Sequence, residues 1–523
     1  MTLNKRILLI SLIVLVLAIF VINEVALSNH SPHQIILTWQ QKPRTTMTIT
    51  WRAQVQNLKK VESVIKYSNV ESTKEKGRKK KAETFSFDET DSWLHTVELT
   101  GLNPGSRYSA KVETNGAESE EFFFETIPEQ GQQVTFIAGG DSRTDRDSRR
   151  MINKKVASER PDFVLFDGDL ITDPMSASQW NDWFEDWDEL LVTKEGRRIP
   201  IVPAIGNHEV VGEYSQEKKD APFYYQRFIL PGNEKYYTLD FGSFTVLTMD
   251  SGHTSSINGK QKTWLKRNLE NIGKNETIVL QYHVPAWPST GNPYTGLHGE
   301  IIKHWVPIFE ENDVDLVSEA HEHNYKQTYP LFGTSRINSK FQEAIQTGIE
   351  KARKKFDSNK DYSPWSNKKL QKLSKGEYKE IGYKDVLTAM EALCLEYSLY
   401  AKQQSKLTVE YVRDLVTSSK LYSKYWENIT QSSGFSDLTR PGKGKGVVFI
   451  GDGSWGAPTG RNIPYGNMVD KGKWWLKKAG IFFNYWEISV IPKNGKMEAV
   501  PHLYSKEKRK WFEGQKILIQ IDD

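Results

Sequence analysis

Cysteine is almost absent from this sequence, because Cys394 is the only one among 523 residues. A single cysteine excludes a disulfide within the chain and any metal site built on two thiolates. An exported protein without disulfides must take its stability from hydrophobic cores or from bound metal ions.

A strong charge of one sign is also missing. The 70 lysines and arginines nearly balance 66 aspartates and glutamates, which leaves a formal net charge of +4. Composition therefore gives no signal for nucleic-acid binding. A hydrophobic content of 38% with 16 tryptophans indicates a globular protein, and 523 residues are too many for one core. We expect two or three domains.

The N-terminus carries one uninterrupted apolar run, residues 7–22, directly after Lys5 and Arg6. A membrane-spanning helix needs about 20 apolar residues, so this run is short for a full span. We expect residues 1–28 to be a cleaved signal peptide or an uncleaved membrane anchor. Either interpretation predicts an exported protein that is periplasmic, extracellular or attached to the membrane by this segment.

Residues 33–127 consist of short runs rich in β-branched and aromatic residues, which predicts a β-sandwich. Trp51 is expected in its core. The turn before Tyr108 resembles the tyrosine corner of fibronectin type III domains, whose hydroxyl bonds to upstream backbone. The basic run of residues 78–81 is expected on an exposed loop.

Beyond a linker near Pro128, apolar strands alternate with amphipathic helices, as in an α/β sheet. The helices are expected near residues 147–158, 177–192, 259–272 and 299–311. Residues 336–443 interrupt this alternation and are rich in Lys, Ser and Gln. We interpret them as a helical insertion in one catalytic domain formed by residues 132–335 and 444–507. A separate third domain is the alternative.

Five short polar motifs each follow the carboxyl end of a predicted strand, where open α/β sheets bind ligands. They are Gly139-Gly140-Asp141-Ser142-Arg143, Asp167-Gly168-Asp169, Gly206-Asn207-His208-Glu209, Tyr282-His283-Val284-Pro285 and Ala320-His321-Glu322-His323-Asn324-Tyr325. One such motif would mean little, since Gly-Asp pairs are common in turns. Five clusters of Asp, Asn and His at one sheet edge predict a metal centre.

Two metal ions about 3.5–4 Å apart need a bridging carboxylate, and Asp169 suits that position. Imidazoles and an amide oxygen favour Zn, Mn or Fe over Mg or Ca. Such a pair of cations lowers the pKa of a bound water and stabilises the charge on a phosphate group.

The order of these motifs resembles the calcineurin-like metallophosphoesterase superfamily, and the preceding sandwich narrows the resemblance to the purple acid phosphatase group. It implies an α+β multidomain protein in which a β-sandwich precedes a four-layer α/β/β/α catalytic domain. The resemblance assigns Asp141 and His323 to the first metal, Asp169 to the bridge, and Asn207, His283 and His321 to the second metal. It also implies that His208 and, by a weaker match, His298 face the substrate.

Two positions depart from the family pattern. Thr172 stands where the purple enzymes have a metal-binding tyrosine, three residues after the bridging aspartate. Arg143 stands where the wider superfamily often has a histidine. We expect Arg143 either to grip a phosphate oxygen or to pair with a structural acid such as Asp145.

These observations predict a metal-dependent hydrolase of small or macromolecular phosphate esters, in first place phosphomonoesters. Hydrolysis of phosphodiesters or nucleotides is the enzymatic alternative, because the same metal pair serves both. A non-catalytic surface binder with a degenerate metal fold is the third possibility. Six ligand positions argue against it, since a binding module has no need of a bridging aspartate.

Overall fold

The structure is a computed structural model of the full chain. It describes residues 31–521, apart from 54–60, 73–76, 88–91, 144, 273–275, 292, 294, 332–333, 458–474 and parts of 359–382 and 418–445. The predicted signal or anchor, residues 1–28, lies outside the described residues. No helix in the described part combines the length and apolar character that crossing a bilayer requires.

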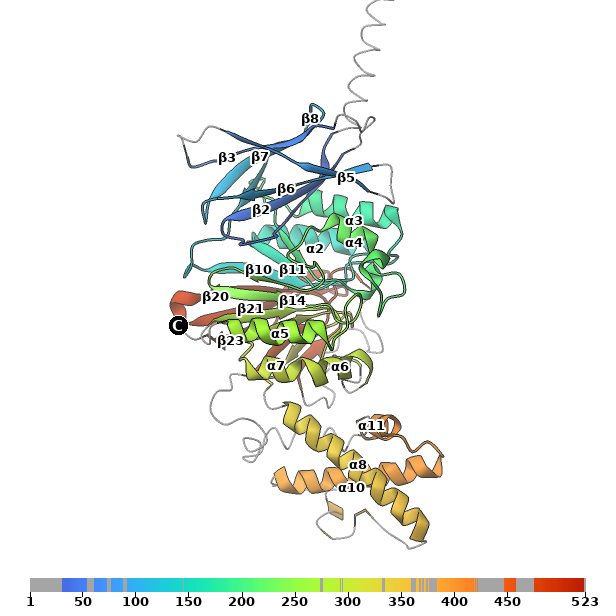
Figure 1. The fold of residues 1–523 in the computed structure, drawn as a ribbon. Coiled ribbons are helices and arrows are strands. Elements are labelled where there is room, and N and C mark those ends of the chain that lie inside the picture. Colours follow the sequence, from blue (N-terminus) through green and yellow to red (C-terminus); the bar gives the residue numbers. More distant parts are fainter. Residues whose placement is uncertain are drawn as a thin grey trace, which may run out of the picture.

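The N-terminal domain is a β-sandwich, as predicted (Figure 1). One sheet has the order β1-β2-β6-β5, and the other has the order β4-β3-β7-β8 with β9 paired to β7. The strands are β1 (His33–Thr38), β2 (Thr46–Ala53), β3 (Ser63–Asn69), β4 (Arg78–Lys81), β5 (Glu83–Phe87), β6 (Ser92–Thr100), β7 (Arg107–Thr114), β8 (Ala117–Glu118) and β9 (Phe122–Glu125).

Two details of this domain match the sequence interpretation and one does not. Trp51 is fully buried between the sheets. The Tyr108 hydroxyl accepts a hydrogen bond from the Asn103 backbone N–H at 2.8 Å, the contact expected of a tyrosine corner. The expectation of a loop at residues 78–81 was wrong, because these residues form the exposed strand β4 at the edge of a sheet. Lysines on an edge strand discourage pairing with other chains, so charge is compatible with a strand there.

Among the described residues, the predicted catalytic domain contains two mixed seven-stranded sheets. The first has the order β12-β11-β10-β20-β21-β22 with β23 paired to β21, and the second has the order β13-β14-β15-β16-β18-β17-β19. The strands of the first are β10 (Val134–Gly139), β11 (Phe163–Phe166), β12 (Ile201–Pro203), β20 (Phe483–Ile491), β21 (Lys496–Ser505), β22 (Lys510–Glu513) and β23 (Ile517–Gln520). Those of the second are β13 (Tyr237–Asp240), β14 (Phe244–Thr248), β15 (Thr277–Gln281), β16 (Leu316–Glu319), β17 (Tyr325–Thr328), β18 (Val448–Gly451) and β19 (Leu476–Gly480).

Helices cover the outer faces of both sheets, which gives the predicted four layers (Figure 1). The helices are α2 (Arg146–Glu159), α3 (Ala177–Leu190) and α4 (Pro222–Arg227) on the side of the first sheet, and α5 (Lys260–Asn271), α6 (Gly296–His304) and α7 (Val306–Glu311) on the side of the second. Phe136 of β10 and Val279 of β15 belong to one buried cluster, so the two sheets pack face to face. The single helix predicted near residues 299–311 is two helices, because the chain turns at Trp305 and Pro307 starts the second.

The sandwich is docked on the catalytic domain by buried polar contacts. Asp188 of α3 accepts hydrogen bonds from the backbone N–H groups of Gln34 and Ile35. The buried guanidinium of Arg227 donates to Gln34 Oε1 at 2.8 Å and lies 3.7 Å from the Phe184 ring centroid. Strand β1 is thereby fixed to the predicted catalytic domain.

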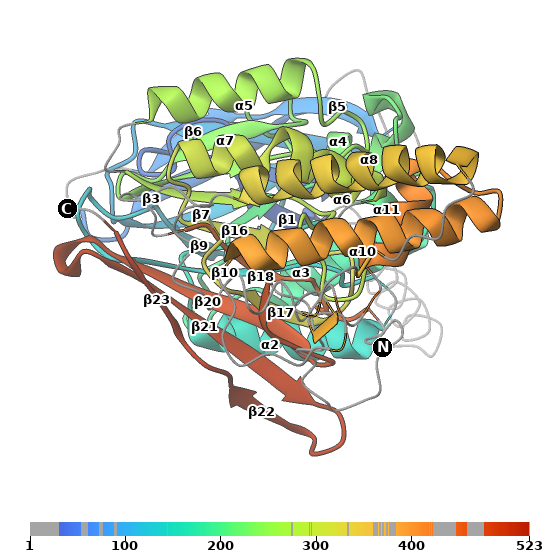
Figure 2. The same cartoon turned by 90° about the horizontal axis from the view of Figure 1, so that it is seen from below.

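Between β17 and β18 the chain forms the helices α8 (Thr334–Ser358), α10 (Tyr383–Gln403) and α11 (Val409–Thr417). They lie together beyond α6 and α7 (Figures 1 and 2). Phe341 and Leu393 share a buried cluster with Phe309 of α7. The interpretation of residues 336–443 as an insertion, with the domain bounds given above, stays a prediction.

Candidate metal centre

The site lies where strands from both sheets end. Asp141 follows β10, Asp169 follows β11, and Asn207 stands in a short 3-10 helix (Asn207–Glu209) after β12. His283 follows β15, and His321 and His323 lie between β16 and β17. The fold therefore brings all six predicted ligands to one place.

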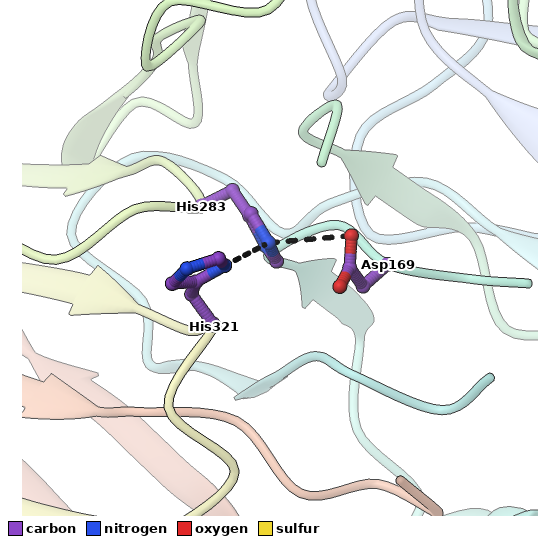
Figure 3. A group of neighbouring side chains, drawn as sticks. All are labelled: Asp169, His283 and His321. Atoms are coloured by element: carbon purple, nitrogen blue, oxygen red, sulfur yellow. Dashed lines mark hydrogen bonds and ion pairs between the residues drawn. The ribbon is translucent and has the colours of Figure 1, made fainter. Parts of the chain in front are cut away.

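Asp169 belongs to two overlapping groups of possible ligands. One group consists of Asp169, His283 and His321, and the other of Asp141, Asp169 and His323; within each group the ligand atoms lie within 4.8 Å of one another. Figure 3 shows the first group, with His283 between the aspartate and His321. The shared position of Asp169 is the geometry that a bridging carboxylate requires.

The group of Asp169, His283 and His321 is arranged for a cation. His283 Nδ1 lies 2.8 Å from the carbonyl oxygen of Asp167, which can only accept, so this nitrogen carries the proton and Nε2 is the ligand atom. Nε2 lies 3.0 Å from Asn207 Oδ1, 3.2 Å from Asp169 Oδ1 and 3.2 Å from His321 Nδ1. Burial lowers the pKa of His283, but Asp169 outweighs this effect and raises it to about 9. A bound cation would take the place of the proton that the carboxylate attracts.

The group of Asp141, Asp169 and His323 has a carboxylate oxygen without a hydrogen bond. Asp141 is fully buried, and its Oδ2 accepts the backbone N–H of His321 at 2.7 Å. Its Oδ1 lies 3.3 Å from His323 Nε2 and accepts no hydrogen bond from the described residues. A buried carboxylate oxygen in this position is costly unless a cation satisfies it.

Four of the six predicted ligands have left-handed backbone conformations, with φ of +59° at Asp141, +57° at Asp169, +77° at His321 and +57° at His323. Such conformations cost about 1–3 kcal/mol each in residues other than glycine and gather at functional sites. The local backbone therefore favours a binding role over a packing role for these side chains.

Buried side chains behind the ligands fix the loops. Glu209 accepts the backbone N–H groups of Gly206 at 2.7 Å, Asp169 at 2.9 Å and Leu170 at 2.7 Å, so it ties the loops after β11 and β12 together. Ser142 donates to the Leu170 carbonyl and accepts from the Trp183 indole, both at 3.0 Å. Sequence reasoning gave Glu209 no role, although it follows His208 within the same motif.

Arg143 and His208 lie together against Asp169. The guanidinium contacts His208 Nε2 and lies 3.5 Å from Asp169 Oδ2. His208 Nδ1 donates to the Thr172 carbonyl at 2.7 Å, which leaves Nε2 toward the site. Burial raises the pKa of Asp169, but the charges of His283, His208 and Arg143 outweigh it and hold the pKa well below its usual range. Asp145, the alternative partner of Arg143, instead caps α2 and lies 3.9 Å from Lys506.

His298 lies on α6 at the edge of the site. Its Nδ1 lies 2.5 Å from the Pro285 carbonyl oxygen, and its Nε2 lies 3.8 Å from Glu322 Oε1. Glu322 stands between the two predicted ligands His321 and His323 in the chain, so His298 borders the ligand loop. The sequence gave no indication that Glu322 would face it.

A further buried network stands behind this loop. Lys326 Nζ lies 2.5 Å from Glu319 Oε2 and 2.7 Å from Asp452 Oδ1, and all three side chains are fully buried. The Tyr282 hydroxyl donates to Glu319 Oε1 at 2.5 Å. Sequence reasoning missed this network because its members belong to different strands and loops.

Comparisons with known proteins identify two domain families in this chain. Residues 32–126 match the family model for the purple acid phosphatase N-terminal domain, and residues 135–325 match that for calcineurin-like phosphoesterases. An uncharacterized protein of Mycobacterium tuberculosis is 27% identical over 296 residues, which cover 48% of this chain and 54% of that protein. The Fe(3+)-Zn(2+) purple acid phosphatase 12 of Arabidopsis thaliana is 23% identical over 322 residues, 58% of this chain and 66% of that protein. The matched segment thus spans about half to two thirds of these relatives.

Two solved structures share the fold. The purple acid phosphatase PPD1 from yellow lupin (Lupinus luteus) seeds has a TM-score of 0.58 at 13% identity and covers 94% of this chain and 75% of its own. PhoD has a TM-score of 0.56 at 12% identity, and the match covers 94% of this chain and 91% of the PhoD chain. The chain thus contains a purple acid phosphatase N-terminal domain followed by a calcineurin-like phosphoesterase domain.

Proposed function

We propose that this protein is a phosphomonoesterase that hydrolyses phosphate esters with the help of two metal ions. The observation that carries the proposal is the shared position of Asp169 in two ligand groups. A site for one structural metal would have no need of a carboxylate between two groups. The name of the Arabidopsis relative, an Fe(3+)-Zn(2+) purple acid phosphatase, supports the same reaction class.

The donor set fits Fe, Zn or Mn. Asp141, Asp169 and His323 would hold one ion, and Asp169, Asn207, His283 and His321 would hold the other. Imidazole, amide and carboxylate donors suit these metals better than Mg or Ca. When bound, the two ions supply Lewis-acid stabilisation of the phosphate charge and activation of water.

Arg143 and His208 would act directly on the substrate. The guanidinium lies beside the bridging position, where its fork of N–H donors can bind phosphate oxygens. His208 has its ring oriented by the Thr172 carbonyl, which leaves Nε2 toward the site. Once the Arg143 guanidinium turns from Nε2 to a phosphate oxygen, Nε2 can hold the proton that the leaving oxygen needs. His298 would face the substrate from α6.

Metal analysis combined with turnover tests this function. Purified protein loaded with two metals per chain is expected to hydrolyse a chromogenic phosphomonoester faster than the corresponding bis-ester. A preference for the bis-ester would make the protein a phosphodiesterase. Full metal loading without turnover of either ester would favour a binding protein.

The proposed place of action is outside the cytoplasm, on the ground of the apolar run at residues 7–22. Cell fractionation with an antibody against the β-sandwich tests this proposal. Recovery of the protein in the cytoplasmic fraction would contradict it.

A further inference from the structure

A basic hairpin tip projects from the first sheet of the catalytic domain. Strands β21 and β22 pair antiparallel, with Ser505 opposite Lys510 and Tyr504 opposite Trp511. Residues 506–509 form the turn between them. We call residues 506–510, Lys506-Glu507-Lys508-Arg509-Lys510, the hairpin tip; all five are exposed. Figure 2 shows β22 at the periphery of the molecule.

Aromatic packing holds the hairpin in a fixed shape. The Trp511 ring centroid lies 5.3 Å from that of Tyr504 and 5.4 Å from that of Tyr485. On the neighbouring position, the Phe512 ring lies edge-on to Phe482 at 5.3 Å. Because these rings pack on one another, the tip is presented on a preorganised support.

Lys506 places the tip next to Asp145, which follows β10 in the chain. Its Nζ lies 4.1 Å from the Phe483 ring centroid and 3.9 Å from Asp145 Oδ2. Asp145 is two residues from Arg143, whose guanidinium contacts His208 and Asp169. The hairpin tip therefore lies next to the loop that carries the proposed phosphate-binding arginine.

The charge of the tip is concentrated and unbalanced. It has four basic residues and one acidic residue within five positions, although the whole chain has a formal net charge of only +4. Among the described residues, the side chains of Lys508, Arg509 and Lys510 form no ion pair. Three adjacent cations without acidic partners repel one another, and an anionic ligand would relieve that repulsion.

We propose that the hairpin tip binds the phosphate groups of a linear, base-free phosphate polymer whose terminal phosphoryl group, held by a phosphoanhydride bond, reaches the metal centre. This inference rests on the proposed phosphatase function and narrows its substrate class to extended polyanions. The tip itself carries no aromatic side chain, so its residues recognise a ligand by charge and not by stacking on nucleobases. Positive charges near a site raise the association rate of anions by about 10–10³-fold.

The test compares two triple variants of the full, metal-loaded chain. The first is Lys508→Gln/Arg509→Gln/Lys510→Gln, and the matched control is Lys79→Gln/Lys80→Gln/Lys81→Gln on the exposed strand β4. Both remove three exposed charges. Binding of end-labelled linear inorganic polyphosphate is followed by fluorescence anisotropy at several salt concentrations.

We expect the hairpin variant to bind polyphosphate about tenfold more weakly, while the β4 variant binds like the wild type. For single-stranded polyanions, the logarithm of the binding constant falls by about 0.7 per tenfold rise in salt for each phosphate that the protein neutralises. Removing three cations should therefore make the slope of log binding constant against log salt concentration shallower by about 2. Turnover of a small chromogenic monoester should be equal in all three proteins.

Three outcomes would overturn the inference. They are equal polyphosphate binding by the wild type and the hairpin variant, an equal loss in the β4 variant, or tighter binding of a single-stranded oligonucleotide of the same charge. Binding does not depend on turnover, so an inactive protein that still binds through the tip would contradict only the proposed function.

Discussion

The Asp141 carboxylate accepts a hydrogen bond from the backbone N–H of His321 at 2.7 Å, although the two residues are 180 positions apart in the chain. This bond joins the loop after β10 in one sheet to the loop after β16 in the other. The candidate metal centre therefore depends on the packing of the two sheets, and its residues are expected to respond to substitution as one unit.

Replacing Asp169 should affect both metals. Asp169→Asn removes the negative charge that lies between the two ligand groups, so the repulsion between two cations is less compensated. We expect loss of both metals by elemental analysis and loss of phosphomonoester turnover. Asp145→Asn, which changes an aspartate at a helix N-cap, is the control and should keep both metals. Two bound metals and wild-type turnover in Asp169→Asn would disprove the site assignment.

Gly453→Ala should disturb Asp141 through direct contact. Gly453 has φ +66°, and a Cβ there would lie 1.6 Å from Asp141 Oδ2. The carboxylate must move, so we expect weaker binding of the first metal and lower turnover. Gly101→Ala is a matched control, because Gly101 has φ +67° with nothing within 4 Å of its Cβ. Equal metal affinity in both variants would contradict the expected role of Gly453.

His208 is expected to serve in proton transfer, without binding metal. His208→Ala should therefore lose about 10²–10⁴-fold in rate and retain its metals. The loss should be smallest for esters with acidic leaving groups, which need no proton. Since Arg143 contacts His208 Nε2, the variant Arg143→Gln should raise KM, and the double variant should show a non-additive effect. Metal loss in proportion to rate loss in His208→Ala would argue for a ligand role instead.

Lys326 should be important for stability, because it is the buried cation between two buried carboxylates. Lys326→Met leaves Glu319 and Asp452 without their partner and should lower the free energy of unfolding by about 3–5 kcal/mol. Lys66→Met, at an exposed ion pair with Glu113 and Glu118, should have a far smaller effect. Denaturant titration of both variants measures the difference. Equal free energies of unfolding would show that the buried network makes no net contribution to stability.

The protein is expected to be colourless. The purple colour of the family that this chain resembles comes from a tyrosinate bound to Fe(III), and the corresponding position here is Thr172. The nearby tyrosines are engaged elsewhere: Tyr282 donates to Glu319 at 2.5 Å, and Tyr325 donates to Gln327 at 3.3 Å. An absorption spectrum of iron-loaded protein should lack an intense visible band. Such a band, abolished by Tyr282→Phe or Tyr325→Phe, would show that another tyrosine binds iron.

Local sequence patterns predicted most of the strands and helices of the catalytic domain. The periodic apolar residues placed α2, α3 and α5 within two residues of their observed bounds, because amphipathic patterns report burial directly. The exposed strand β4 was missed, since its four basic residues carry no apolar pattern and its conformation follows from pairing with β3. The break between α6 and α7 was missed as well, because apolar residues continue across Trp305.

The sequence by itself determined the kinds of side chain available for a metal centre and their places at strand ends. Those features are local, and the chemistry of Asp, Asn and His donors does not depend on the rest of the chain. Only the tertiary structure decided which of these side chains meet. It placed Asp169 in two ligand groups, turned Arg143 toward His208 and away from Asp145, and joined Lys326 to Asp452. These contacts depend on how strands distant in sequence are ordered within two packed sheets, and no local pattern encodes that order.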